Sequence, residues 1–204
     1  MSVAQLIADY AGSLFDVVGI TKLLSGHNLL ILGLESTLER NLDEFGRLGS
    51  HFQIYGFAKY IGPGLEELLK FIHGKNFSAE SLGRYGYPLH GEVNLKKEVI
   101  RAGLGKRGKS TVVLHPKYGP RLRFMAIRTD APLEPLIGPN LPEEESPFCS
   151  GCTICIDACP VSALEPYHMP DPSICLSNIN IMTEEKGQLI PCDICLHRCP
   201  ANSQ

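Results

Sequence analysis

The sequence contains no apolar run long enough to cross a membrane. Its longest clean run, Leu29–Leu34, has six residues, whereas a membrane-spanning helix needs about 20. The first residues, Met1–Phe15, lack the basic start of a signal peptide, and Asp9 interrupts their apolar stretch. We therefore expect a cytoplasmic location and no membrane partner.

Cysteine is absent from the first 148 residues. All eight cysteines lie between Cys149 and Cys199, a concentration that neither scattered thiols nor a secreted disulfide framework would produce. The rest of the composition is ordinary for a globular protein, with 44% hydrophobic and 20% charged residues, so a core is available and disorder is not expected. A metal or cluster site is therefore expected in the last quarter of the chain.

Charge of one sign is not in large excess, but it is unevenly distributed. The formal net charge is −3, of which residues 141–204 contribute −7 and the remainder +4. The segment Lys96–Arg128 holds ten lysines and arginines and a single acid, Glu98. This segment is either a solvated face or a site for an anion, an acidic protein surface or RNA.

The cysteine spacing is that of a bacterial ferredoxin. The first run is Cys149-x2-Cys152-x2-Cys155-x3-Cys159-Pro160, and its second part recurs as Cys192-x2-Cys195-x3-Cys199-Pro200. In this spacing three thiolates of one tight loop bind one [4Fe–4S] cluster, and the fourth cysteine binds the other cluster. The sequence therefore predicts two [4Fe–4S] clusters that carry electrons.

The predicted assignment uses every cysteine. The ligands of cluster 1 are Cys149, Cys152, Cys155 and Cys199, and those of cluster 2 are Cys159, Cys175, Cys192 and Cys195. Because Cys175 lies 17 positions before Cys192 instead of three, a loop or short helix must bring it in. We expect dry surroundings from Val161, Ala163, Leu164, Ile174, Ile194 and Leu196. Two zinc sites would also use eight cysteines, but a three-cysteine loop with a crossing Cys-Pro is not a usual zinc spacing.

The first 130 residues mix helix and strand patterns. Helices are expected around Gln5–Tyr10, from Gly62-Pro63-Gly64 to a stop at Gly74, and over Leu95–Ala102 between the cap Asn94 and Gly103. Leu38, Leu42 and Phe45 also follow helical spacing within Thr37–Leu48. Asn28–Leu34 suits a buried strand. Thr111–His115 and Arg121–Arg128 flank turn residues and predict a hairpin with one wet face.

The stretch Ala131–Pro147 is rich in proline, glycine and glutamate and is the expected linker. We accordingly predict an α/β domain over residues 1–140 and a cluster-binding domain over residues 141–204.

The segment Gly103–Ser110 matches the phosphate-binding pattern G-x4-G-K-[ST]. Its candidate cofactor-binding residues are Gly103, Gly105, Gly108 and Lys109. A phosphate-binding loop follows a strand and precedes a helix, whereas here the helical pattern comes first. The alternative is that Gly103 ends a helix and the other glycines shape a connection. His90 and His115 flank this loop and are the two histidines that merit a test.

Several segments share the pattern of a known family. They are Phe15–Ile20, Leu30–Leu34, Ala102-Gly103-Leu104-Gly105-x2-Gly108-Lys109, Val113-Leu114-x-Pro116-x-Tyr118-Gly119, Thr129-Asp130-Ala131-Pro132-Leu133 and the cysteine run behind them. Together they resemble the epoxyqueuosine reductases, relatives of the corrinoid reductive dehalogenases. The resemblance implies an α+β fold, a nitroreductase-like mixed α/β domain followed by a two-cluster ferredoxin-like module. It also implies that cobalamin receives electrons from the clusters.

The chain resembles a shortened, divergent member, because it departs from the family at catalytic positions. The family carries Asp-Tyr-His where this chain has Tyr60-Ile61-Gly62-Pro63, and a general-acid Asp where this chain has Gly91-Glu92-Val93-Asn94. Glu92 is therefore the candidate catalytic residue.

Three functions are compatible with these patterns. The first is an electron carrier that passes electrons from its clusters to a corrinoid or another redox centre. The second is a complete cobalamin-dependent oxidoreductase, and the third is an ATP-coupled reductase that uses the Gly103–Ser110 loop. The expected partner is a redox protein or a small-molecule electron donor, with a corrinoid and RNA as further candidates.

Overall fold

The computed structural model describes residues 2–48, 51–83, 93–135, 145–177, 188–189 and 192–203. The chain divides into two compact units. The first, here called the α/β unit, comprises Met1–Glu35, Lys59–Leu104 and Arg123–Glu144, and the second, the cysteine unit, comprises Ser36–Ala58, Gly105–Leu122 and Glu145–Gln204. The predicted domain boundary between residues 140 and 141 stays a prediction. None of the described helices combines the length and the apolar character that a membrane span requires.

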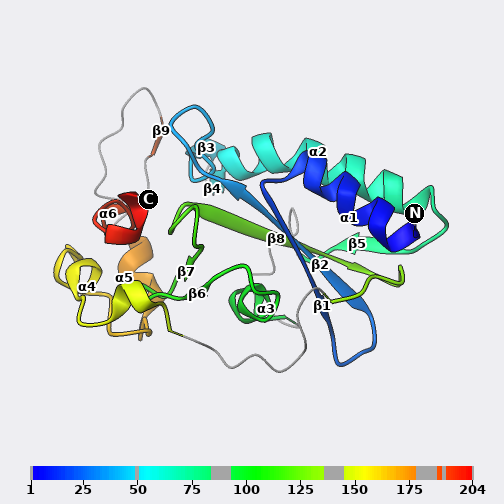
Figure 1. Ribbon diagram of the computed structural model, residues 1–204. Helices are drawn as coiled ribbons and strands as arrows, with labels where there is room; N and C mark the ends of the chain where they lie inside the picture. Colours follow the sequence, from blue (N-terminus) through cyan, green and yellow to red (C-terminus); the bar gives the residue numbers. More distant parts are fainter. Residues whose placement is uncertain are drawn as a thin grey trace. The chain divides into compact units, whose positions relative to one another are not determined.

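The α/β unit is built on a four-stranded sheet (Figure 1). Its strand order is β1 (Val17–Lys22), β2 (Asn28–Glu35), β8 (Leu122–Thr129) and β5 (Ala79–Ser81). β1 and β2 form an antiparallel hairpin, and β5 pairs antiparallel with β8. Seven of the eight residues of β2 are buried, as expected for an apolar strand with a neighbour on each side. The buried strand predicted at Asn28–Leu34 is confirmed.

Helix α1 (Val3–Leu14) packs on α2 (Tyr55–His73). The side chain of Ser2 caps α1 by accepting the backbone N–H of Gln5 at 3.2 Å. Tyr10 of α1 stacks on Phe71 of α2 with ring centroids 4.1 Å apart, and its hydroxyl donates to Glu67. The two helices therefore lie side by side, as Figure 1 shows. The predicted N-terminal helix is confirmed, and it is longer than Gln5–Tyr10.

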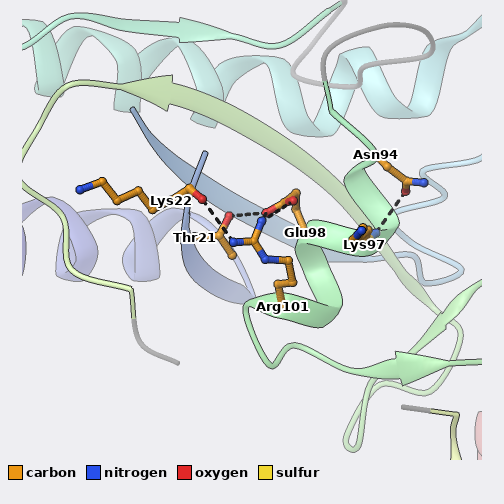
Figure 2. Close-up of polar contacts among 6 residues, drawn as sticks. All are labelled: Thr21, Lys22, Asn94, Lys97, Glu98 and Arg101. Carbon is orange, nitrogen blue, oxygen red and sulfur yellow. Dashed lines mark hydrogen bonds and ion pairs between the residues drawn. The ribbon is translucent and has the colours of Figure 1, made fainter. Parts of the chain in front are cut away.

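Helix α3 (Leu95–Arg101) is tied to β1 by a buried carboxylate (Figure 2). Glu98, which is 7% exposed, accepts the hydroxyl of Thr21 at 2.8 Å and Nη1 of Arg101 at 2.7 and 2.8 Å. Arg101 also donates to the carbonyl of Lys22 at 3.3 Å. These donors compensate the desolvation of the carboxylate. The cap Asn94 accepts the N–H of Lys97 at 3.2 Å, so the predicted helix and its cap are confirmed.

The helical spacing within Thr37–Leu48 is misleading, because no helix forms there. Described residues of this stretch form turns and then strand β3 (Phe45–Leu48), which pairs with β4 (His51–Ile54) and β9 (Gln188–Leu189). The N–H of Arg40 donates to Thr37 Oγ1 at 3.1 Å, and the N–H of Asp43 donates to Asn41 Oδ1 at 3.0 Å. Side-chain oxygens thus take the donors that helical carbonyls would otherwise accept.

Helix α2 begins before the position that the sequence predicts. The expected opening at Gly62-Pro63-Gly64 lies inside the helix, and Pro63 removes one of its internal hydrogen bonds. Ile61, Leu65, Leu68 and Ile72 are at most 4% exposed, so burial of this face offsets the missing bond. The predicted end before Gly74 is correct.

The predicted hairpin between Thr111–His115 and Arg121–Arg128 is wrong. β7 (Val113–Leu114) pairs instead with β6 (Lys106–Arg107), and β8 lies between β2 and β5 in the larger sheet. Six of the eight residues of β8 are buried, so the strand has no fully wet face. Its two arginines, Arg123 and Arg128, are five positions apart and are only partly exposed. Residues 136–144 of the expected linker Ala131–Pro147 lie outside the described residues.

Candidate functional site

The cysteine unit contains the same short turn twice. α4 (Ile154–Asp157) and α6 (Ile194–His197) are single helical turns that carry Cys155 and Cys195. The fourth residue of each turn donates its N–H to the carbonyl of the residue before the turn, at 3.0 Å in both. The turns end at Ala158 and Arg198, directly before a Cys-Pro pair. The repeat in the sequence therefore has a counterpart in the backbone.

Three of the other cysteines lie in or next to short helical elements. Cys149 closes the 3-10 helix η1 (Pro147–Cys149), and Cys175 lies within α5 (Pro172–Ser177). Cys199 directly precedes another 3-10 helix, η3 (Pro200–Ser203). The short helix that the sequence requires around Cys175 is thus present.

The thiols fall into two groups by their electrostatic neighbours. All eight cysteines are free of disulfides. The thiol of Cys155 interacts with those of Cys149, Cys152 and Cys199. The thiol of Cys175 interacts with those of Cys159 and Cys192. The thiol of Cys195 interacts with all three of these thiols, and also with that of Cys155 from the first group. Each group of four contains one cysteine from the far end of the other run.

Burial opposes ionisation of several of these thiols. It raises the pKa of Cys195 to about 12, to which the neighbouring thiols of Cys175 and Cys192 add. Burial is also the largest cause of the raised pKa of Cys155, Cys175 and Cys199. Thiolates crowded in this way need cationic iron or another metal ion to remain ionised at neutral pH, because metal binding displaces the thiol protons. The donor set therefore fits a thiolate-bound metal group.

A single ion and a cluster require different arrangements of thiolates. Among the residues that the structure describes, no three His, Cys, Asp or Glu side chains are grouped as ligands of one metal ion. Tetrahedral thiolates around one zinc ion lie about 3.8 Å apart, given a Zn–S bond of about 2.3 Å. In a four-iron cluster each thiolate binds its own iron, so the thiolates around a cluster lie farther apart than those around one zinc ion.

Apolar residues cover one side of the first thiol group. Cys149 packs with Leu114 and Ala201. Four partly buried residues pack against these three, namely Val112, Phe148, Tyr167 and Cys199. Of the residues expected to form dry surroundings, Ala163 and Leu164 are buried. That expectation is wrong for Ile174 and Ile194, which are 42% and 40% exposed.

Backbone N–H groups donate to thiols in both groups. The N–H of Lys109 donates to Cys149 Sγ at 3.4 Å, and the N–H of Ala163 donates to Cys159 Sγ at 3.3 Å. The ammonium of Lys109 donates to the carbonyl of Cys152 at 2.9 Å. Lys109 thus contacts the same loop with both its backbone and its side chain.

The glycine loop does not have the architecture of a phosphate-binding loop. Gly103 has φ +72° and ends α3, donating its N–H to Ile100 at 2.9 Å while Leu104 donates to Val99 at 3.1 Å. These bonds form a helix-terminating motif that favours glycine. Strands β6 and β7 follow α3, and the element that comes next after Lys109 is strand β7 and not a helix. Gly105 and Gly108 pack closely on Val113 and Leu114, so they shape the connection.

Sequence reasoning missed a second set of contacts in the cysteine unit. The guanidinium of Arg107 lies 5.6 Å from the ring centroid of Tyr167 and donates to the Tyr167 carbonyl at 2.5 Å. Burial and a hydrogen bond to Glu145 raise the pKa of Tyr167 to about 12. Tyr167 has φ +62°, which a tyrosine adopts only when its surroundings hold it. Only the basic character of the loop hinted at these contacts.

Two candidates from the sequence lie outside the described residues, namely Glu92 and His90. The other histidine flanking the loop, His115, accepts the N–H groups of Lys117 and Tyr118 at Nδ1, at 3.0 and 3.3 Å. His115 therefore holds a turn.

The fold recurs in two kinds of solved structure. A crystal structure of a selenomethionine-labelled epoxyqueuosine reductase matches with a TM-score of 0.69 and 20% identity, covering 98% of this chain and 65% of that one. A reductive dehalogenase structure, described with a mechanism for B12-dependent dehalogenation, matches with a TM-score of 0.69 and 18% identity, covering 98% of this chain and 31% of that one. The chain thus has the mixed α/β fold of these reductases and dehalogenases.

Relatives in sequence agree with the fold. The epoxyqueuosine reductase of Cyclobacterium marinum is 29% identical over 162 residues, which are 74% of this chain and 47% of the relative. The tetrachloroethene reductive dehalogenase of Dehalobacter restrictus is 34% identical over 115 residues, 56% of this chain and 20% of the relative. No family model matches the chain. The chain is therefore related to the epoxyqueuosine reductases and the reductive dehalogenases, as its motifs predict, and spans less than half the length of these two relatives.

Proposed function

We propose that this chain is an electron-transfer protein that holds two [4Fe–4S] clusters and delivers electrons to a corrinoid or another redox centre. The observation that carries the proposal is the grouping of its thiols. Cys149, Cys152, Cys155 and Cys199 form one group, and Cys159, Cys175, Cys192 and Cys195 form the other. These are the ligand sets that ferredoxin spacing predicts, including the exchange of one cysteine between the two runs.

The residues around the thiols have the features of a redox site. The clusters, when bound, would supply one-electron chemistry at low potential. Leu114, Phe148 and Ala201 exclude water from the side of Cys149, and low solvent access tunes a reduction potential. Backbone N–H groups of Lys109 and Ala163 stabilise negative charge on the sulfur atoms of Cys149 and Cys159.

A corrinoid is the proposed acceptor because of the relatives. One neighbour in fold is described with B12-dependent dehalogenation, and the similarity to such structures covers 98% of this chain, including its α/β unit. That coverage also favours a second candidate function, a complete cobalamin-dependent oxidoreductase similar to the epoxyqueuosine reductases. One such reductase has been crystallised with an epoxyqueuosine-modified tRNA stem loop, so its substrate here would be RNA.

One anaerobic experiment tests the electron-transfer proposal and separates the two candidates. The chain is purified without oxygen, iron and sulfide are measured, and cob(II)alamin is added while EPR and visible spectra are recorded. We expect about eight irons per chain, four for each of two clusters, and a change in the cobalt signal. Cobalamin binding together with turnover of an epoxyqueuosine stem loop would favour the complete enzyme. Zinc in place of iron would contradict both functions.

A further inference from the structure

The backbone of Lys109 is held on both sides. Its carbonyl accepts the N–H of Tyr167 at 3.1 Å, and the preceding residue, Gly108, donates to the carbonyl of Val112 at 2.9 Å. Gly108 is buried among atoms of Leu114 and Val112. The N–H of Lys109 is thereby aimed at Cys149 Sγ, 3.4 Å away.

The ammonium of Lys109 lies against the loop that joins two predicted ligands of cluster 1. Nζ donates to the carbonyl of Cys152 at 2.9 Å. The loop itself is tight, because the N–H of Cys152 donates to the carbonyl of Cys149 at 3.2 Å and Gly151 has φ +67°. Lys109 is half-buried, so water screens its charge less than that of an exposed lysine.

The contact recorded at the other thiol group is of a different kind. There the N–H of Ala163 donates to Cys159 Sγ at 3.3 Å. This hydrogen bond is equivalent to the one from the N–H of Lys109, but the side chain of Ala163 carries no charge. Among the described residues, the two groups therefore share a backbone donor, and only the first has a hydrogen bond from a lysine ammonium to its loop.

We propose that Lys109 is a positioning residue that raises the reduction potential of cluster 1 specifically. This inference rests on the proposed function, since it requires two clusters. Reduction adds one electron from a donor to the cluster, which becomes more negative by one charge while the donor is oxidised. A fixed ammonium and an N–H donor stabilise that added charge, and net charge and hydrogen bonds to sulfur are known determinants of cluster potential. The lysine that resembles a phosphate-binding residue in the sequence thus serves the cluster.

The test is a redox titration, monitored by EPR, of chains that retain one cluster each. Cys175→Ala removes a predicted ligand of cluster 2 and Cys149→Ala one of cluster 1. In the Cys175→Ala background, Lys109→Gln should lower the reduction potential of cluster 1. We expect the ratio of reduced to oxidised cluster at a given applied potential to fall about tenfold, which corresponds to a shift of about 59 mV for one electron. Lys109→Arg should retain the wild-type potential.

Matched controls separate charge at this position from charge elsewhere. Lys106→Gln removes an exposed lysine from the same loop and should leave the potential unchanged, as should Lys109→Gln in the Cys149→Ala background. An equal shift in both backgrounds, or an equal effect of Lys106→Gln, would overturn the inference. Loss of cluster 1 in Lys109→Gln but not in Lys109→Arg would support it, whereas loss in both would overturn it. Absence of iron from the wild-type chain would instead contradict the proposed function.

Discussion

His115 shows how a single side chain makes a turn sensitive to pH. Its Nδ1 accepts two backbone N–H groups, from Lys117 and Tyr118, and can do so only while it carries no proton. Burial, followed by the charge of Lys117, lowers the pKa of His115 below its ordinary value of 6.5. The unfolded chain therefore takes up a proton at a higher pH than the folded chain does.

The first prediction concerns this pH dependence. The contribution of neutral His115 to the free energy of unfolding is complete above about pH 6.5, and it is lost as the pH falls through the lowered pKa of the folded state. The free energy of unfolding should fall by no more than about 1.4 kcal/mol per pH unit in this range. His115→Asn keeps an acceptor for the turn without a titrating group. Urea unfolding at pH 7.5 and 5.5 should show a smaller acid loss for this variant than for wild type. The exposed control His27→Asn should behave as wild type, and an unchanged acid loss in His115→Asn would refute the prediction.

The second prediction concerns the carboxylate of Glu98. Glu98→Ala leaves Arg101, whose side chain is 20% exposed, and the buried hydroxyl of Thr21 without their acceptor. We expect a loss of about 2–3 kcal/mol in the free energy of unfolding, somewhat below the cost of breaking a fully buried pair. Lys97→Ala, an exposed change on the same helix, should cost less than about 0.5 kcal/mol. Equal losses from the two variants would show that the pair contributes nothing.

At the scale of elements, a turn holds the C-terminal 3-10 helix within the cysteine unit. Arg121 donates to the carbonyl and to the side-chain oxygen of Asn202, at 2.6 and 3.0 Å. Gly119 has φ +55°, and a Cβ there would lie 2.0 Å from the carbonyl oxygen of Ala201. The turn and η3 therefore touch backbone to backbone, next to Cys199.

The third prediction isolates this close approach. Gly119→Ala should destabilise the chain by about 3 kcal/mol, because strain at positive φ adds to a steric clash. Gly26→Ala is the matched control, since Gly26 has φ +87° but open space around it, and should cost about 1 kcal/mol. Thermal unfolding of both variants measures the difference. If the two glycines cost the same, the contact with Ala201 is unimportant.

At the scale of the whole molecule, the proposed exchange of one cysteine between the two runs predicts which four cysteines bind each cluster. Cys175→Ala should reduce the iron content from about eight to about four per chain and remove one EPR signal. Cys149→Ala should remove the other signal and leave the first. Iron analysis and EPR of the reduced proteins measure both effects. Loss of all iron in either variant, or of none, would contradict the assignment.

Local patterns in the sequence predict the elements whose causes are local. Asn94 and Gly103 mark the ends of α3, because a cap and a terminating glycine act within a few residues. The spacing of Cys152, Cys155 and Cys159 likewise predicts the repeated turn, since two- and three-residue gaps permit few backbone paths.

Tertiary packing decided the remaining features. β8 pairs in the larger sheet instead of with Val113–Leu114, because strand pairing depends on which distant partner buries more apolar surface. Pro63 lies inside α2 because burial of that face outweighs one lost hydrogen bond. Lys109 contacts the loop of Cys149 and Cys152, 40 and 43 residues away in sequence. No local pattern specifies a contact at that separation, because it forms only when the chain has folded.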